Sequence, residues 1–395
     1  MEIFAATAPG LESIAAGEIK GLGVRGRQQA GGVSFEGDHR LLYRANLHLR
    51  TPSRVIVRLG RFHATTFYEF ERRAKKIPWQ NFLPAQGLVG IRVTCRKSRL
   101  YHSDAVAERV LSVISEVRAD IELARPSPED TDNSDETENE PASRIQRFVV
   151  RIVDDQCEIS ADSSGELLHR RGYRQEVAKA PLRETLAAAM ILASGWRPGE
   201  PLLDPMCGSG TIPIEATMIA RRIAPGLRRE FQFMHWPSFD AGLWKELVTA
   251  AQNQITRSDS TIRGGDRDSG AIEASTHNAQ RAGVADDIEF ASRPLAASLD
   301  ALQDIESGEG WVLTNPPYGI RVGESGDLRN LYARLGTITQ KGWRLGVLTA
   351  DQRLARHAGT PLRSRFDTKN GGIPVSFLAT EKAGKSAVTS PVSKR

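Results

Sequence analysis

Four residues whose types could do chemistry, Asn315, Pro316, Pro317 and Tyr318, directly follow the apolar run WVLT. Two consecutive prolines cannot donate ladder hydrogen bonds, so a strand must end there. The rigid turn aims the side-chain oxygen of Asn315 and the carbonyl of Pro316 at one point, where both can accept N–H bonds from a planar –NH2 group. Tyr318 offers a face for a flat ring. The pattern predicts a site that orients a poorly nucleophilic amine for attack on a methyl group, without a strong base.

A glycine turn, DPMCGSGT, separates an apolar run ending at Asp204 from a predicted helix over residues 211–222. Gly208 and Gly210 let the backbone approach a ligand, and the helix N-terminus offers N–H groups to an anion. No Gly-Lys-Ser/Thr follows, and Pro213 breaks the dinucleotide fingerprint, so neither phosphate motif fits. With Asp204 facing an amine and the helix facing a carboxylate, the turn suits the methionine end of S-adenosylmethionine.

Asp266 ends the next predicted strand, within the segment GGDRD. An acidic residue at that position of a doubly wound fold pairs with ribose hydroxyls, and this is the role we predict for Asp266. Asp268 either supports it or caps the next helix, and either aspartate could serve only as a cap. A glycine turn alone would favour a purely structural reading; coupled to Asp266, it favours a cofactor site.

The elements that must position these residues begin near residue 180. Short strands alternate with helices there, which predicts an α/β domain with a mostly parallel, doubly wound sheet. The turn NGG at residues 370–372 predicts a C-terminal hairpin that adds an antiparallel strand. The predicted helices are 181–194, 211–222, 269–282 and 326–340, and the predicted strands 201–204, 261–266, 288–290, 311–314 and 343–350.

The first 165 residues mix helices with antiparallel strands, which indicates small α+β layers. Residues 89–95 alternate as a strand, residues 104–118 have a helical period, and residues 147–161 form a hairpin that turns at Asp154-Asp155. Residues 124–143 are densely charged and lack large apolar side chains, so we predict a disordered surface insert, with an acidic interaction segment as the alternative. A flexible tail is predicted over residues 383–395.

Composition narrows the class of protein. The 395 residues, 40% apolar and 26% charged, suffice for two or three cores, and no apolar run approaches the ~20 residues of a membrane span. Glu2, Glu12 and Glu18 interrupt the apolar N-terminal positions, which argues against a secretory signal. Three cysteines without metal-ligand spacing favour a reducing cytoplasm and predict no structural metal.

Charge is uneven along the chain. Residues 1–118 hold 19 Lys and Arg against 10 Asp and Glu, which suggests a nucleic-acid partner, although a solvated basic surface fits charge alone equally well. Tyr101 and His102 could stack on bases or pack internally. The segment HRRGYR (169–174) could contact RNA or brace two domains, and the brace is favoured. The candidate phosphate contacts are Arg72, Arg73, Lys75, Lys76, Arg96, Lys97 and Arg99.

Taken together, DPMCGSGTIPIEA and TNPPYGIRVG resemble the THUMP-domain class I S-adenosylmethionine-dependent RNA methyltransferases that modify guanine N2. The resemblance extends to APGLESIAAGEIKGLG, ADSSGELLHRRGYR and APGLRREFQFMHW, and so to nearly the whole chain. It implies a ferredoxin-like segment (1–45), a THUMP RNA-binding domain (46–165) and a Rossmann-like methyltransferase domain (166–382). It also implies a protein that acts on structured RNA, either rRNA or tRNA, and we expect this protein to be a monomer.

The resemblance assigns roles to single residues. Asn315, Pro316, Pro317 and Tyr318 are expected to bind the target amine, and Thr185 is expected near the methionine carboxylate. One departure is EFASRPLAAS (289–298), which lacks the aspartate that many relatives place against the adenine amino group, so no adenine contact is assigned. The residues expected to bind the cofactor are Asp204, Cys207, Gly208, Ser209, Gly210, Thr211, Asp266 and Thr185.

Three other functions stay open from the sequence. A DNA adenine-N6 methyltransferase could use the same Asn-Pro-Pro-Tyr sequence, but it would not need a THUMP-like half, and no target-recognition domain follows the catalytic one. A glutamine-N5 protein methyltransferase would not need a basic half of this size. A catalytically silent RNA-binding protein is opposed by the intact residues Asp204, Asp266 and Asn315.

Overall fold

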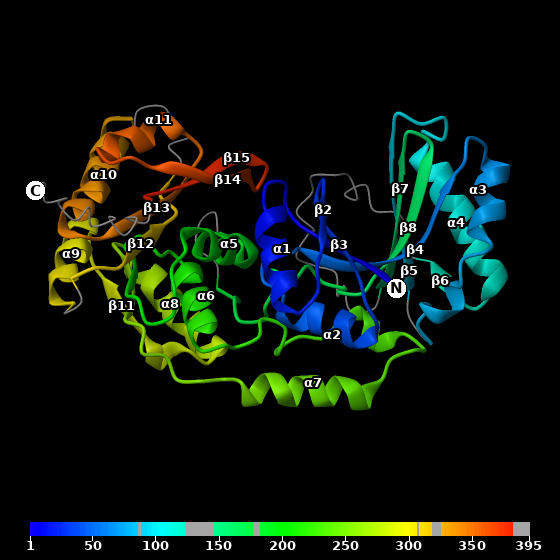
Figure 1. The fold of residues 1–395 in the computed structure, drawn as a ribbon, viewed down its shortest axis with the longest axis horizontal. Coiled ribbons are helices and arrows are strands. Elements are labelled where there is room, and N and C mark those ends of the chain that lie inside the picture. Colours follow the sequence, from blue (N-terminus) through cyan, green and yellow to red (C-terminus); the bar gives the residue numbers. More distant parts are fainter. Residues whose placement is uncertain (86–87, 124–144, 177–181, 306–307, 318–324, 382–395) are drawn as a thin grey trace, which may run out of the picture.

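The protein is described by a computed structural model over residues 1–85, 88–123, 145–176, 182–305, 308–317 and 325–381. Two β-sheets, one built by each half of the chain, occupy the two ends of an elongated molecule (Figure 1). The predicted acidic insert (124–143) and the predicted tail (383–395) lie outside the described residues, as does Tyr318.

The first sheet has the strand order β2-β3-β1-β4-β8-β7-β5-β6 among the described residues. All of strand β1 pairs with the first half of β4, so the predicted ferredoxin-like segment and the residues after it share one continuous sheet. The elements of this half are β1 (Glu2–Ala6), α1 (Glu12–Gly21), β2 (Arg27–Gln29), β3 (Gly32–Glu36), α2 (His39–His48), β4 (Arg54–His63), α3 (Phe67–Ala74), β5 (Leu88–Arg96), α4 (Ser103–Val117), β6 (Glu122–Leu123), β7 (Ile145–Val153) and β8 (Gln156–Asp162).

The second sheet has the order β11-β10-β9-β12-β13-β15-β14, in which the first five strands are parallel and the last two form an antiparallel hairpin. This confirms the predicted Rossmann-like sheet and its added hairpin. The elements of this half are α5 (Glu184–Ser194), β9 (Leu202–Asp204), α6 (Thr211–Ala220), α7 (Ala241–Asn253), β10 (Ile262–Asp266), α8 (Ser269–Ala282), β11 (Ile288–Ser292), α9 (Leu295–Asp300), β12 (Trp311–Thr314), α10 (Ser325–Gly336), β13 (Arg344–Thr349), α11 (Gln352–Ala355), β14 (Arg363–Asn370) and β15 (Ile373–Ala379).

Local sequence explains where several elements begin and end. Asp268 caps α8, because its carboxylate accepts a hydrogen bond from the Gly270 N–H at 2.9 Å. Helix α5 ends at Gly195, which adopts the left-handed conformation that favours glycine. The β7–β8 hairpin turns at Asp154 and Asp155, both with positive φ, as predicted.

Helix α7 was not predicted from the sequence. Figure 1 shows it along the lower edge of the molecule, where it packs against α2 and spans from one half toward the other. Its buried side chains Leu247 and Ala251 join the core of the first half, although α7 lies in the second half of the sequence. The two halves therefore share apolar packing as well as a chain connection.

None of the described helices is long and apolar enough to cross a membrane. Within the described ranges, no group of three or more His, Cys, Asp or Glu side chains is arranged to hold a metal ion.

Candidate active site at the carboxyl edge of the second sheet

The strand order of the second sheet reverses between β9 and β12. From β9 the chain moves outward to β10 and β11, and then returns to β12 on the other side of β9. In open α/β sheets, ligands bind at the carboxyl ends of the strands at such a switch point. Asp204 ends β9 and Asn315 directly follows β12, so both flank this position, with Asp266 at the end of the next strand.

Asp204 is joined to the strand that carries the predicted amine site. The Thr314 hydroxyl donates to Asp204 Oδ1 at 2.7 Å, and the Met206 N–H donates to the same oxygen at 3.1 Å. Asp204 is buried, and burial raises the pKa of its carboxyl to about 7. Because Thr314 immediately precedes Asn315, this bond fixes the start of the Asn-Pro-Pro turn against the glycine turn.

Asp266 holds the glycine turn from the other side. Its Oδ2 accepts from the Gly208 N–H at 3.0 Å, and its Oδ1 accepts from the Asp268 N–H at 3.1 Å. Each oxygen of a carboxylate can accept more than one hydrogen bond, so Asp266 keeps capacity for hydroxyl donors. Asp266 is thus not a helix cap, whereas Asp268 is.

Helix α8 presses on the same turn. Gly210 has φ +81°, and a Cβ placed on it would lie 3.0 Å from Cβ of Ser275. Both the left-handed backbone conformation and the close contact with Ser275 therefore favour glycine at this position. Ser275 donates to the Gly208 carbonyl at 2.7 Å, and the buried Asn278 donates to the Ser209 carbonyl at 3.1 Å. Sequence reasoning missed Ser275 and Asn278, although their spacing of three places both on one face of α8.

Asn278 also links the glycine turn to the segment that leads toward α5. Its side-chain oxygen accepts from the N–H groups of Gln175 at 3.3 Å and Glu176 at 3.5 Å. The same oxygen accepts from Arg281 at 2.6 Å, so the amide is fully engaged. Asn278 therefore positions two separate pieces of backbone beside the site.

The remaining predicted site residues fall as follows. Asn315 is half-buried, Pro316 is buried and Pro317 is exposed. Thr185 is the second residue of α5, which packs against α6, and it is buried. Cys207 and Ser209 are buried in the glycine turn, and Thr211, the first residue of α6, is also buried. Burial raises the pKa of the Cys207 thiol well above its ordinary value, which makes that thiol unreactive.

Comparison with known proteins identifies the family. A family model described as "RMKL-like, methyltransferase domain" matches residues 171–375, and one described as "RlmL ferredoxin-like domain" matches residues 2–56. The first match covers more than half of the chain. The chain belongs to the RMKL-like methyltransferase family. The resemblance drawn from its motifs is thereby confirmed at the level of the family.

Two relatives illustrate the match. A candidate RNA methyltransferase of Synechocystis, slr0064, is 35% identical over 386 residues, which are 96% of each chain. The ribosomal RNA large subunit methyltransferase K/L of Magnetococcus marinus is 35% identical over 408 residues, covering 99% of this chain. The match covers 55% of that longer relative.

Two solved structures superpose on almost the whole chain. SMU.472, a candidate methyltransferase in complex with S-adenosylhomocysteine, has a TM-score of 0.80 at 29% identity and covers 96% of this chain and 97% of its own. A Listeria monocytogenes protein described as a predicted N6-adenine-specific DNA methylase has a TM-score of 0.81 at 31% identity, with coverages of 96% and 95%.

The predicted RNA contacts of this family member fall into two separate groups. Arg72, Arg73, Lys75 and Lys76 are exposed at the C-terminal end of α3, where Lys75 pairs with Glu116 at 2.8 Å. Arg96, Lys97 and Arg99 are exposed just before α4 begins. Because Glu116 is near the last residue of α4, the groups lie at opposite ends of a helix about 22 Å long.

The segment HRRGYR is a brace between the halves of the molecule. Buried Arg171 donates to the Arg50 carbonyl at 2.6 Å and lies 3.4 Å from Glu215 Oε1, on α6. The Tyr173 hydroxyl donates to the same Glu215 oxygen at 3.2 Å, and Arg50 lies 3.7 Å from Glu215 Oε2. Because Arg50 belongs to the first half and Glu215 to the second, this cluster fixes one against the other.

Proposed function

We propose that the protein transfers a methyl group from S-adenosylmethionine to the exocyclic N2 amine of a guanosine in structured RNA, either rRNA or tRNA, in the cytoplasm. Methyltransferase activity follows from the family, and the relatives from Synechocystis and Magnetococcus marinus carry RNA methyltransferase names. The observation that carries the proposal is the Thr314–Asp204 bond, which holds the Asn-Pro-Pro turn against the glycine turn at the switch point.

The methyl donor is S-adenosylmethionine, as predicted from the sequence, and its reaction product is bound in the structure of SMU.472. This cofactor supplies an electrophilic methyl group on a sulfonium centre. The residues present fit it: two carboxylates, Asp204 and Asp266, flank a glycine turn that leads into the N-terminus of α6. We assign Asp204 to the amine, Asp266 to the ribose hydroxyls, and the first turn of α6 with Thr185 to the carboxylate.

Asn315 and Pro316 would hold the target. Their two oxygens accept both N–H bonds of the guanine amine, which orients its lone pair and favours tetrahedral geometry at nitrogen. Tyr318 would stack on the base. The base must leave its stack to reach this position, at a cost of about a few kcal/mol, so an exposed or locally opened guanosine is the favoured target.

Replacing Asp266 with alanine should weaken cofactor binding about 10–100-fold, because a charged acceptor of hydroxyl bonds is lost, worth about 1.5–3 kcal/mol. The measurement is a calorimetric titration with S-adenosylhomocysteine. Asp268→Ala is the matched control, since Asp268 only caps α8, and its affinity should stay within about threefold of wild type. An Asp266→Ala affinity equal to that of the control would refute the ribose role.

Cofactor affinity should fall as pH drops below about 7. Burial raises the pKa of Asp204 to about 7, so the carboxyl is protonated at lower pH and must lose that proton to face an ammonium group. Each pH unit below 7 should then weaken binding by about tenfold, or ~1.4 kcal/mol. Titrations from pH 5.5 to 7.5 measure this, and Asp204→Asn should bind weakly at every pH without the slope.

The stability of the free protein should respond to pH in the opposite direction. Because the folded-state pKa of Asp204 lies above its unfolded value, the folded state binds the extra proton, and this contribution is present at low pH. It is lost as pH rises through about 7. A cofactor affinity that stays constant over the same range would show that Asp204 does not face the amine.

The proposed function is tested by incubating the purified protein with S-adenosylmethionine carrying a labelled methyl group and, separately, with bulk tRNA, deproteinised rRNA and duplex DNA. Digestion to nucleosides then identifies the labelled product. Label in N2-methylguanosine supports the proposal. Label in N6-methyladenine of the DNA would favour the DNA adenine-N6 alternative, which is also the description of the Listeria relative.

A further inference from the structure

The open side of the first sheet carries a row of arginines. Along β7 the even-numbered residues are buried beneath α3 and α4, so Arg147 and Arg151 project from the opposite side. Along β5 the residues Val89, Ile91, Val93 and Cys95 contact the same core, so Arg92 and Arg96 project with Arg147 and Arg151. The parallel register of β5 and β7 keeps all four on one side, and we call these four residues the arginine face.

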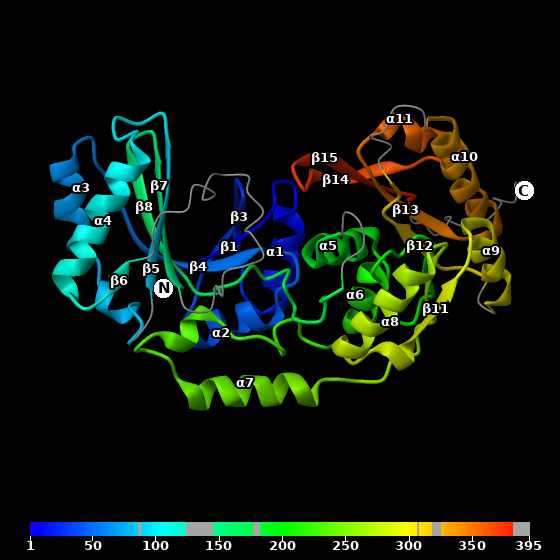
Figure 2. The same cartoon turned by 180° about the vertical axis from the view of Figure 1, so that it is seen from behind.

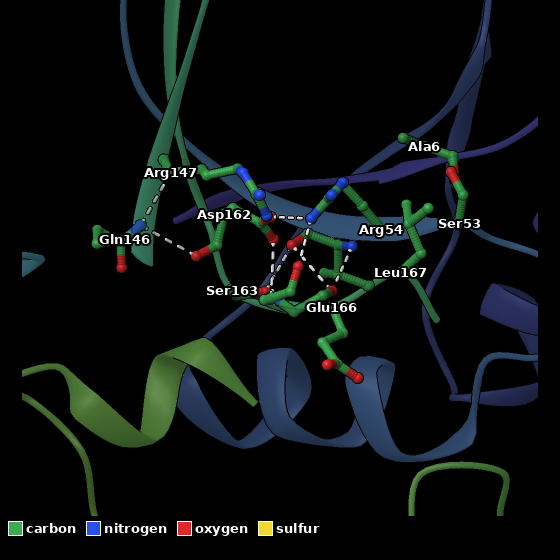
Figure 3. Close-up of polar contacts among 12 residues, drawn as sticks. Ala6, Ser53, Arg54, Gln146, Arg147, Asp162, Ser163, Glu166 and Leu167 are labelled. Atoms are coloured by element: carbon green, nitrogen blue, oxygen red, sulfur yellow. Dashed lines mark hydrogen bonds and ion pairs between the residues drawn. The ribbon is translucent and has the colours of Figure 1, made fainter. Parts of the chain in front are cut away.

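One end of the arginine face lies beside an acidic residue of the protein itself. The guanidinium of Arg54 contacts the carboxylate of buried Asp162, and Figure 3 shows the side chains of Arg54 and Arg147 both pointing toward Asp162. On the neighbouring strand β8, Glu158 lies opposite Arg151, but its carboxylate is engaged by Arg61 at 2.7 Å. Positive charge therefore remains in excess at the other end, around Arg92 and Arg151.

Arg92 and Arg151 are the two members best placed for an external anion. Within the part of the chain that the structure describes, no hydrogen bond or ion pair engages either side chain. Arg151 lies beside Thr94 in register, midway between Arg92 and Arg96, which are about 13 Å apart along β5. The three guanidinium groups thus form a broad positive surface rather than a single point.

The arginine face is turned toward the catalytic half. In Figure 1 and, from behind, in Figure 2, α3 and α4 form the outer end of the molecule, and β4, β5, β7 and β8 lie between them and the remainder. The basic end of α3 is therefore in the outer layer, on the opposite side of the sheet from Arg92 and Arg151. An RNA whose base enters the site at Asn315 can reach the inward side of the sheet without wrapping around the helical layer.

We infer that the arginine face binds the RNA backbone, and that Arg92 and Arg151 contact phosphates of the same RNA whose guanosine is methylated. This inference rests on the proposed function and adds the surface that positions its substrate. Phosphate contacts from arginine fix the orientation of an RNA without reading its bases. The exposed residues Arg72 and Arg73 on the outer layer are the competing surface.

The test compares three double variants of the full chain with equal change in charge. These are Arg92→Glu with Arg151→Glu on the arginine face, Arg72→Glu with Arg73→Glu on α3, and Lys245→Glu with Arg257→Glu on exposed positions in and after α7. Dissociation constants for deproteinised rRNA and for bulk tRNA are measured over a range of salt concentrations. Binding of S-adenosylhomocysteine verifies that each variant is folded.

The arginine-face variant should lose at least about tenfold in RNA affinity at low salt, and its slope of log affinity against log salt should fall by about 2, one for each lost phosphate contact. The α7 control should stay within about threefold. If the α3 variant loses the affinity and the arginine-face variant keeps it, the inference is overturned. If charge reversal unfolds the arginine-face variant, the double variant Arg92→Gln with Arg151→Gln replaces it in the comparison. Its slope of log affinity against log salt must still change by more than the slope of the α7 control.

Measuring methyl transfer at saturating RNA distinguishes a failure of this inference from a failure of the proposed function on which it rests. Suppose that the wild-type protein forms N2-methylguanosine and that the arginine-face variant binds RNA as tightly as wild type. The proposed function would then be supported, and the arginine face would be refuted as an RNA-binding surface. A wild-type protein that forms no methylated guanosine in either RNA would remove the function itself, whatever the binding data show.

Discussion

Replacing Asn315 with alanine is expected to lower the rate of methyl transfer at least about 10²–10³-fold while leaving cofactor affinity within about threefold of wild type. The loss of one preorganised polar group at a reacting centre typically costs a factor of that size. The separation of the two effects follows from position: Asn315 lies past the end of β12, whereas the cofactor contacts are assigned to Asp204, Asp266 and α6.

The measurement for Asn315 is single-turnover methyl transfer at saturating RNA, with a calorimetric titration of S-adenosylhomocysteine in parallel. Asn253→Ala, at the exposed end of α7, is the matched control and should behave as wild type in both. A loss of cofactor affinity equal to the loss of rate would place Asn315 in the cofactor site instead. An unchanged rate would remove the amine-binding role.

Replacing Glu215 with alanine is expected to destabilise the protein by about 3–5 kcal/mol, the usual cost of removing one partner from a buried ion pair. Glu215 is fully buried, and its carboxylate faces Arg171, Arg50 and the Tyr173 hydroxyl. Without it, two buried guanidinium groups lose their counter-charge at the contact between the two halves. Thermal unfolding monitored by circular dichroism should show a midpoint lower by several degrees.

Two companion variants separate charge from shape at Glu215. Glu215→Gln keeps an oxygen that can accept from Tyr173, and it should cost less than alanine. Glu215→Leu combined with Arg171→Met removes the pair together, and it should recover part of the loss because apolar replacements of a buried pair are often tolerated. Equal midpoints for Glu215→Ala and wild type would show that the cluster does not brace the halves.

The parallel sheet could be predicted from sequence, and a candidate site placed at its carboxyl edge, because both depend on local signals. The alternation of short apolar runs with helices predicted the strands β9 to β13, and the turn residues Gly371 and Gly372 predicted the hairpin. Asp204 and Asp266 could be proposed as cofactor contacts because a strand end beside a glycine turn is a pattern of neighbours in sequence. The family and its donor then followed from these motifs.

Other features depend on contacts between residues that are distant in sequence, which a local pattern does not reveal. Helix α7 was missed because its apolar side chains, such as Leu247, pack on the first half rather than on its neighbours in sequence. The Thr314–Asp204 bond joins residues 110 positions apart, and Asn278 meets Ser209 across 69. The division of the basic residues between α3 and the arginine face likewise depends on which side of the sheet each side chain occupies.

The structure also shows where the segment 289–298 lies, which lacks the aspartate that many relatives place against the adenine amino group. The N–H of Arg293 donates to the Asp266 carbonyl at 2.7 Å, so the segment after β11 lies directly beside the residue assigned to the ribose. The Arg293 side chain pairs with Glu289, on β11, at 3.3 Å. Backbone groups of this segment are therefore close to the ribose end of the site, although the residue that would contact the adenine amino group stays unassigned.

The central claim is methylation of guanosine N2 in RNA, and nucleoside mass spectrometry on separated tRNA and rRNA, from cells with and without the gene, tests it most directly. The account predicts that N2-methylguanosine falls in one of the two pools and returns when the wild-type gene, but not the Asn315→Ala variant, is supplied. Unchanged N2-methylguanosine in both pools, with a change in N6-methyladenine instead, would contradict it.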